Sequence, residues 1–180
     1  MSYYLGIDPG KNGALVLFDD TKFLAWLIMP KTKENEIDIP LLNKWIQTYT
    51  STNTEIFCVL EDVHSIFGMS AASNFQFGRG LGILEGVLGA NNIEFAKVTP
   101  KVWQKEIWKD TTPIAEETGK KLKSGLPQVK IDTKATSLLV AKQLFPNVDF
   151  LATKRSSVAH DGWVDAMLIT EYCRRKFKTK

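Results

Sequence analysis

The sequence predicts an α/β protein whose mixed β-sheet has five strands and is flanked by helices. Residues 3 to 29 contain three short apolar runs separated by tight turns, which indicates an antiparallel meander. Beyond residue 40, apolar runs of strand length alternate with segments whose apolar residues recur at helical spacing, as in other α/β domains. A chain of 180 residues suffices for one such domain with a substantial core. We therefore expect a single domain over residues 1–180.

Each expected element follows from its apolar pattern and from the residues at its ends. Pro30 and the polar residues after it end the third strand, and Pro40 suits the first turn of the next helix. Asp132 or Thr133 is expected to cap a later helix, which Pro146 ends. In chain order, we expect strands at about 3–8, 12–18, 22–29, 56–60 and 93–98, and helices at about 41–49, 72–90, 133–144 and 160–175.

The segment at about 109–130 has little periodicity. It contains proline, glycine, threonine and several lysines, so we expect a mobile basic loop there. Acidic side chains predominate over residues 1–96 and basic ones over 97–134 and 154–180, although the net charge is only +3. A protein that binds metal ions with acids and phosphates with bases would show this distribution, and so would a protein with a lysine-rich solvated surface.

The cysteines and the hydropathy pattern indicate the compartment. Cys58 and Cys173 are too few for a disulfide framework and have no neighbouring Cys or His cluster that would suggest zinc. No segment approaches the roughly 18 apolar residues of a membrane span, and the N-terminus does not resemble a signal peptide. We expect a soluble cytoplasmic protein that does not contact a membrane.

Four acidic residues are expected to converge. Asp8 and Glu61 each end an apolar strand, so their side chains reach the edge of the sheet. Asp161 and Asp165 are four residues apart on an expected helix and share one face. Because like charges at this spacing repel, we expect a cation to neutralise them, and oxygen-only ligands suit Mg²⁺ or Mn²⁺. Two such ions can activate a water molecule and stabilise the leaving oxygen of a phosphodiester.

Simpler explanations exist for three of these acids. Asp8 precedes Pro-Gly and could be only a turn former. Glu61 could be a surface residue, with the neighbouring Asp62 competing for its role, and Asp161 could be only the N-cap of the last helix. Asp165 is harder to explain in this way, because it lies in an apolar run where an uncompensated carboxylate is costly.

Five segments occur in the order seen in Holliday-junction resolvases of the RuvC type. They are Gly6-Ile7-Asp8-Pro9-Gly10, Leu60-Glu61, Phe77-Gly78-Arg79-Gly80-Leu81-Gly82-Ile83-Leu84-Glu85-Gly86, Val98-Thr99-Pro100-Lys101-Val102-Trp103 and His160-Asp161-Gly162-Trp163-Val164-Asp165-Ala166. The chain resembles this family over nearly its whole length, and its phage-encoded branch most of all. The least matched part lies at about 109–130. No single segment is decisive, but five in sequence are a strong signal.

The resemblance implies an RNase H-like nuclease domain, a homodimer, and magnesium-dependent symmetrical nicking of four-way DNA junctions. By position, Asp8, Glu61 and Asp165 match three metal ligands of the family. The bacterial enzymes usually place the fourth acid three residues before the final aspartate, where this chain has Gly162. Asp161 is one residue further back, and His160 is a rival because some relatives use histidine there.

Several other residues are expected to contact DNA around this site. Phe67 could stack on bases at an opened junction centre or be buried, and His64 could act as a general base or orient a ligand. Lys101 and Lys105, four residues apart, could face the scissile phosphate together and assist catalysis. Contacts to the DNA backbone are expected from Arg79, Lys120, Lys121, Lys123 and the run Arg174-Arg175-Lys176, although any one of them could simply be solvated.

Gly78, Gly82 and Gly86 recur every four residues within an expected helix. Each costs roughly 1 kcal/mol relative to alanine, so their presence needs a reason. They would let another helix approach closely across a dimer interface, or let this helix pack tightly on the protein's own sheet.

The sequence therefore predicts a crossover junction endodeoxyribonuclease that uses Mg²⁺, with Mn²⁺ able to substitute. It would leave a 5′-phosphate and a 3′-hydroxyl and, if phage-encoded, would act in the host cytoplasm. A nuclease of other branched DNA, flaps or RNA-containing duplexes is an alternative. So is a junction-binding protein without catalytic activity.

Overall fold

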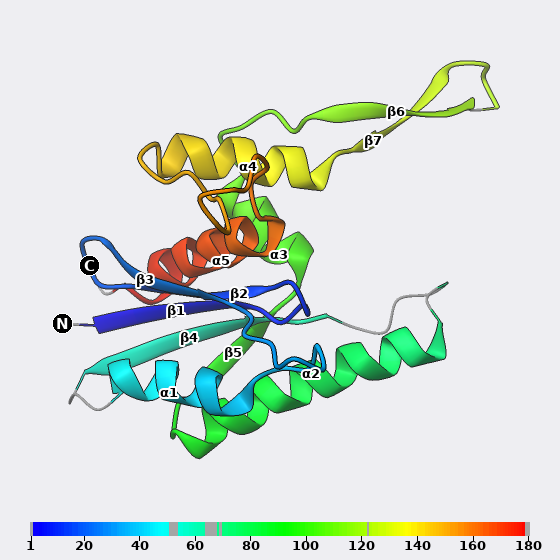
Figure 1. Cartoon of the computed structure of the whole chain (residues 1–180). Coiled ribbons are helices and arrows are strands. Elements are labelled where there is room, and N and C mark those ends of the chain that lie inside the picture. Colours follow the sequence, from blue (N-terminus) through cyan, green and yellow to red (C-terminus); the bar gives the residue numbers. More distant parts are fainter. Residues whose placement is uncertain (1, 51–53, 64–67, 69, 122, 179–180) are drawn as a thin grey trace.

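A five-stranded sheet forms the centre of the computed structural model, which describes residues 2–50, 54–63, 68, 70–121 and 123–178 (Figure 1). The strand order is β3-β2-β1-β4-β5. β1 (Ser2–Asp8), β2 (Ala14–Phe18) and β3 (Phe23–Ile28) form an antiparallel meander, whereas β4 (Glu55–Glu61) and β5 (Phe95–Val98) continue the sheet in parallel with β1. The predicted α/β architecture with a mixed five-stranded sheet is confirmed.

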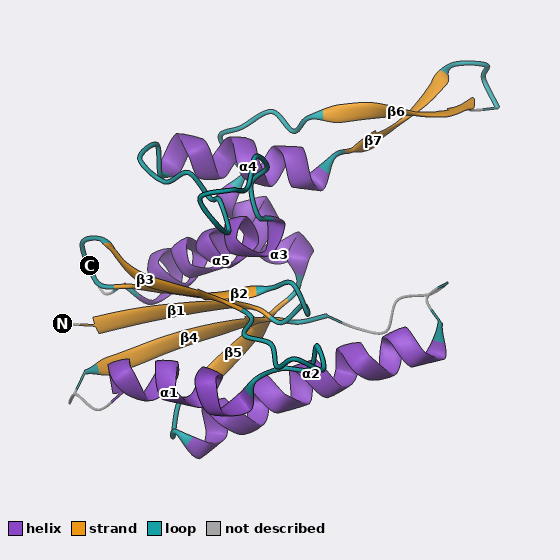
Figure 2. Cartoon of the chain, in the orientation of Figure 1, coloured by secondary structure: helices purple, strands orange, loops and turns teal. Residues whose placement is uncertain are grey.

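Helices cover both faces of the sheet (Figure 2). α1 (Ile39–Thr50) and α2 (Ala71–Ala90) lie on one face. α3 (Pro100–Ile107) and α5 (Asp161–Phe177) lie on the other, and α4 (Thr133–Leu144) packs on α5. Side chains alternate between the two faces along each strand, so Tyr4 and Val59 join the core under α5 while Leu5 and Leu60 join the core under α1 and α2. Because both faces are covered, the strands are almost continuously apolar.

α5 is the helix that lies closest to the sheet. It packs on β1 and β2, and a side chain at Gly6 of β1 would overlap the backbone of Thr170 in α5. This close approach fixes the middle of α5 against β1. No helix in the described part of the chain is long and apolar enough to cross a membrane.

Two elements differ from the sequence-based expectation. The segment expected to be an irregular loop contains β6 (Ala115–Lys121) and β7 (Pro127–Ile131), an antiparallel hairpin that extends away from the sheet (Figure 1). Its side chains are almost all exposed, so no apolar alternation marked its strands. α3 was also not predicted, because a helix of 8 residues is too short to display a helical repeat. The mobility of the hairpin segment stays a prediction.

Candidate functional site

Two neighbouring parallel strands bring acidic residues to the same edge of the sheet. Asp8 is the last residue of β1 and Glu61 the last of β4. The register pairs Ile7 with Leu60, so the two acids occupy the next positions of adjacent strands. Since side chains alternate, Glu61 lies on the same face as Val59, which belongs to the core under α5. Both acids are therefore delivered to the face that α5 covers.

The start of α5 brings the other two acids to this edge. Asp161 is the first residue of α5, and Asp165 follows one turn later. Between them, Gly162 lies against the turn that joins β1 to β2, and a side chain there would overlap the carbonyl group of Asn12. Residue 162 must therefore lack a side chain for α5 to approach Asp8 this closely. An acidic side chain therefore does not fit at residue 162.

The electrostatics of the acids reflect their shared environment. Burial raises the pKa of Asp8 to about 6, with a further rise from Asp161 and an opposing hydrogen bond from the backbone N–H of Gly10. Burial raises the pKa of Asp165 to about 7, and Asp8 raises it further. Burial and then Asp8 raise the pKa of Glu61 to about 8. Asp8 thus interacts electrostatically with each of the other acids.

Neighbouring side chains hold these acids in place. The indole N–H of Trp103, in α3, donates a hydrogen bond of 2.8 Å to Oε1 of Glu61. Ser137, in α4, hydrogen-bonds Asp165 and thereby lowers the pKa of that carboxyl. Sequence reasoning missed both supporting roles. Trp103 had been noted only as part of a motif, and nothing in the sequence near Ser137 links it to Asp165.

The structure distinguishes His160 from Asp161. His160 is the N-cap of α5, since its Nδ1 accepts a hydrogen bond of 3.2 Å from the backbone N–H of Trp163. The alternative that Asp161 is the cap is therefore wrong. Burial lowers the pKa of His160. Asp161 instead forms an ion pair of 2.5 Å with Lys134, in the first turn of α4, and about half of its side chain is exposed.

The acids suit a divalent cation by their chemistry. They offer only carboxylate oxygens, the ligands that Mg²⁺ and Mn²⁺ prefer. Gathering partly buried acids at one edge is costly, as the raised pKa values of Asp8, Glu61 and Asp165 show, and a cation would relieve that cost. As the side chains lie, however, the described residues include no group of three His, Cys, Asp or Glu close enough to hold an ion.

The other predicted site residues do not form one group with these acids. Lys101 and Lys105 are exposed on α3 and Arg79 forms an ion pair with Glu36. Phe67 and His64 lie outside the described residues. The three hairpin lysines, Lys120, Lys121 and Lys123, are exposed at or near its far end, away from the acids (Figure 1).

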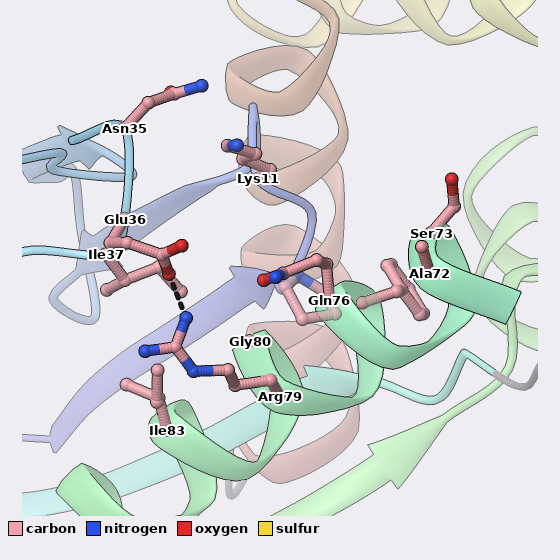
Figure 3. Close-up of a pocket in the computed structure, with 12 residues that line it drawn as sticks. Lys11, Asn35, Glu36, Ile37, Ala72, Ser73, Gln76, Arg79, Gly80 and Ile83 are labelled. Carbon is pink, nitrogen blue, oxygen red and sulfur yellow. Dashed lines mark hydrogen bonds and ion pairs between the residues drawn. The ribbon is translucent and has the colours of Figure 1, made fainter.

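A pocket of about 420 Å³ adjoins the acidic edge. It lies between α2 and the turn after β1, and its lining begins with Pro9, directly after Asp8. Figure 3 shows Lys11 and Asn35 on one side and Gln76 and Arg79 of α2 on the other. The pocket therefore has polar side chains on both sides and includes the residue that follows Asp8.

Comparison with known proteins identifies the fold. No family model matches the sequence, and a search of curated proteins returned no match. Among solved structures, the chain is similar to Thermus thermophilus RuvC in complex with a Holliday junction substrate, with a TM-score of 0.58, 12% identity, and 100% of this chain and 99% of that chain covered. It is also similar to a structure described as Thermus thermophilus RuvC, with a TM-score of 0.56, 12% identity, and 98% and 97% covered. The chain therefore has the RuvC-like form of the RNase H-like fold.

Proposed function

We propose that the protein is a magnesium-dependent endonuclease that resolves four-way DNA junctions by paired symmetrical nicks. The observation that carries this proposal is that β1, β4 and α5 deliver Asp8, Glu61 and Asp165 to one sheet edge, where burial raises the pKa of each acid and Asp8 further raises those of the other two. The similarity in fold to a RuvC bound to a Holliday junction supports the choice of substrate.

In this proposal, Asp8, Glu61 and Asp165 hold the metal ions and Asp161 is the fourth ligand. His160 is the weaker candidate because its Nδ1 already caps α5. The ions would supply an activated water and neutralise the charge that develops on the leaving oxygen. Trp103 and Ser137 orient two of the acids through their hydrogen bonds.

Basic residues on several elements would position the DNA. Of the two candidate lysines, we assign assistance at the scissile phosphate to Lys101, in the first turn of α3, rather than to Lys105 one turn later. Arg79 beside the pocket, and Lys120, Lys121 and Lys123 on the hairpin, would contact the backbone of the junction arms. Phe67 follows Glu61 in the chain and would contact bases at the junction centre.

A homodimer would supply the two active sites that paired nicks need. The glycines of α2 support this part of the proposal. An added side chain at Gly78, Gly82 or Gly86 would meet nothing within 4 Å, so the alternative that they pack tightly on the protein's own sheet is wrong. They leave a bare helix face to which a second copy could bind closely.

The test is cleavage of a synthetic four-way junction with Mg²⁺ or Mn²⁺. Matched linear duplex, flap and RNA–DNA hybrid substrates serve as comparisons, and Asp8→Asn is the catalytic control. We expect symmetrical cuts in strands of like polarity, with 5′-phosphate ends. Faster cutting of flaps or hybrids would assign another substrate. Tight junction binding without cutting, or cutting unaffected by Asp8→Asn, would contradict the proposal.

A further inference from the structure

A second hollow lies between α3 and α5, separate from the acidic edge. Its volume is about 470 Å³, and two helices distant in sequence contribute its walls. α3 and the residues just after it provide Lys105 and Lys109, while the last turns of α5 provide Tyr172, Arg175 and Lys176. Four cationic side chains therefore line one concavity, together with one acid, Glu106.

The charges around this hollow are only partly neutralised. Lys109 pairs with Glu106 at 3.3 Å, and Arg175 pairs with Glu171 at 2.8 Å. Within the described residues, no carboxylate forms an ion pair with Lys105 or with Lys176, whose ammonium lies 5.7 Å from the ring centre of Tyr172. An anion in the hollow would meet two uncompensated cations, and its binding would reduce their mutual repulsion.

α5 connects this hollow to the acidic edge. Asp165 lies near the start of the helix and Arg175 near its end. Ten residues of helix at about 1.5 Å each place the backbone of Arg175 roughly 15 Å further along the axis. Successive base pairs of a duplex are about 3.4 Å apart, so this separation corresponds to about four to five base pairs.

We propose that the hollow binds a backbone phosphate of one junction arm, about four to five base pairs from the cleaved bond. This inference rests on the proposed function and adds a second contact point to it. A phosphodiester fits the hollow because lysine, arginine and tyrosine side chains are common backbone contacts in protein–DNA complexes. The hollow fixes the direction in which an arm leaves the active site.

The experiment compares junction binding by the wild-type protein, Lys105→Gln/Lys176→Gln and a charge-matched control, Lys44→Gln/Lys142→Gln. Lys44 is exposed on α1, on the opposite face of the sheet, and Lys142 is exposed on α4. Fluorescence anisotropy in EDTA, at several salt concentrations, gives the slope of log affinity against log salt. We expect the hollow variant to lose about 0.9 of slope for each lost phosphate contact, and the control to keep the wild-type slope.

Neutral methylphosphonates placed singly along each arm locate the contact. The wild-type protein should lose affinity when the substitution lies about four to five base pairs from the cut. The hollow variant should lose nothing further at that position. The inference is wrong if the methylphosphonate and the lysine substitutions reduce junction affinity additively. It is also wrong if the hollow variant and the control have equal salt slopes. If inorganic phosphate binds in a way that depends on Lys105 and Lys176, but the losses of junction affinity are additive, the hollow binds an anion other than DNA and the assignment to DNA is wrong.

These outcomes are separate from a failure of the proposed function. A wild-type protein that neither binds nor cuts junctions contradicts the proposed function itself. If the wild-type protein cuts junctions while the hollow variant binds them like the control, only the phosphate site is wrong.

Discussion

Acids at the two ends of the sheet differ in how many hydrogen bonds their carboxylates accept. At one end, Asp8 finishes β1, and its Oδ1 accepts a hydrogen bond of 2.9 Å from the backbone N–H of Gly10. At the other end, Asp19 follows β2 and is completely buried. Its Oδ1 accepts three hydrogen bonds, from the backbone N–H and hydroxyl of Thr21 at 2.7 Å and from the backbone N–H of Lys22 at 2.8 Å.

The pKa values of Asp8 and Asp19 are shifted in opposite directions. Burial would raise the pKa of Asp19, but the hydrogen bonds from Thr21 and Lys22 hold it below its usual value. Burial dominates at Asp8 and raises its pKa to about 6. Asp19 is stabilised as the anion by three hydrogen bonds to Oδ1, although its Oδ2 has no hydrogen-bond partner among the described residues. An acid stabilised in this way is structural, whereas one whose charge is left costly is available to a ligand. This contrast separates Asp8 from Asp19 without reference to any relative.

The largest expected effect is the loss of cleavage in Asp8→Asn. Substitution of a residue that supports a metal ligand typically reduces metal affinity or activity about 10- to 100-fold. Removal of a ligand itself should therefore reduce the cleavage rate at saturating junction by at least about 100-fold. The metal-free variant should unfold at the same or a higher temperature than wild type, because an uncharged amide relieves the repulsion. A variant that loses activity together with its melting transition would contradict this prediction.

Gly162→Ala tests whether close packing delivers α5 to Asp8. The added methyl group overlaps the carbonyl group of Asn12, and such overpacking costs about 1–3 kcal/mol of unfolding free energy. We expect lower stability in urea and slower cleavage. Gly82→Ala is the matched control for stability alone, because within one chain its methyl group meets nothing and should add about 1 kcal/mol of helix stability. Equal effects of the two substitutions on stability would show that the packing at residue 162 is not tight.

Asp19→Ala should reduce stability and leave cleavage unchanged, which is the reverse of the effects expected for Asp8→Asn. Its removal leaves the N–H groups of Thr21 and Lys22 without their acceptor, which should cost about 2 kcal/mol of stability. Cleavage per folded molecule should stay near the wild-type rate. The measurement is urea unfolding combined with single-turnover cleavage at a temperature where both proteins are folded.

The smallest expected effect is on the pH dependence of stability without metal. Because Asp8, Asp165 and Glu61 have raised pKa values in the fold, the folded chain binds more protons than the unfolded chain between about pH 4 and pH 8. The stability of the metal-free protein in EDTA should therefore fall as the pH rises through this window. Asp8→Asn should make the fall shallower. Asp19 acts in the opposite direction, since its contribution is lost only when the pH falls through its lowered pKa.

Much of the fold followed from local sequence patterns. The strand ends at Asp8 and Glu61 were predicted because apolar runs stop there, and Asp132 was correctly proposed as the cap of α4, where its side chain accepts from the backbone N–H of Ala135. The hairpin could not be predicted in this way. Its strands face solvent on both sides, so neither side needs apolar residues.

The candidate site was predicted less completely than the fold. Asp161 and Asp165 were placed on one helix face by their spacing alone. The contacts of Trp103 with Glu61 and of Lys134 with Asp161 join segments at least 27 residues apart, and no local pattern reports them. The role of Gly162 was likewise invisible, because it depends on how near Asn12 lies.

The projecting hairpin divides the chain into an N-terminal part and a C-terminal part. Before it come all five strands of the sheet, and after it come α4 and α5, which complete the core. Trypsin should cut at the exposed Lys120, Lys121 or Lys123, since exposed loop tips and their flanks are preferred sites of nicking. The two fragments would stay associated, because α5 remains packed on β1 and β2. The same point would allow the two halves to be expressed as separate polypeptides, so that their reassembly reports on folding.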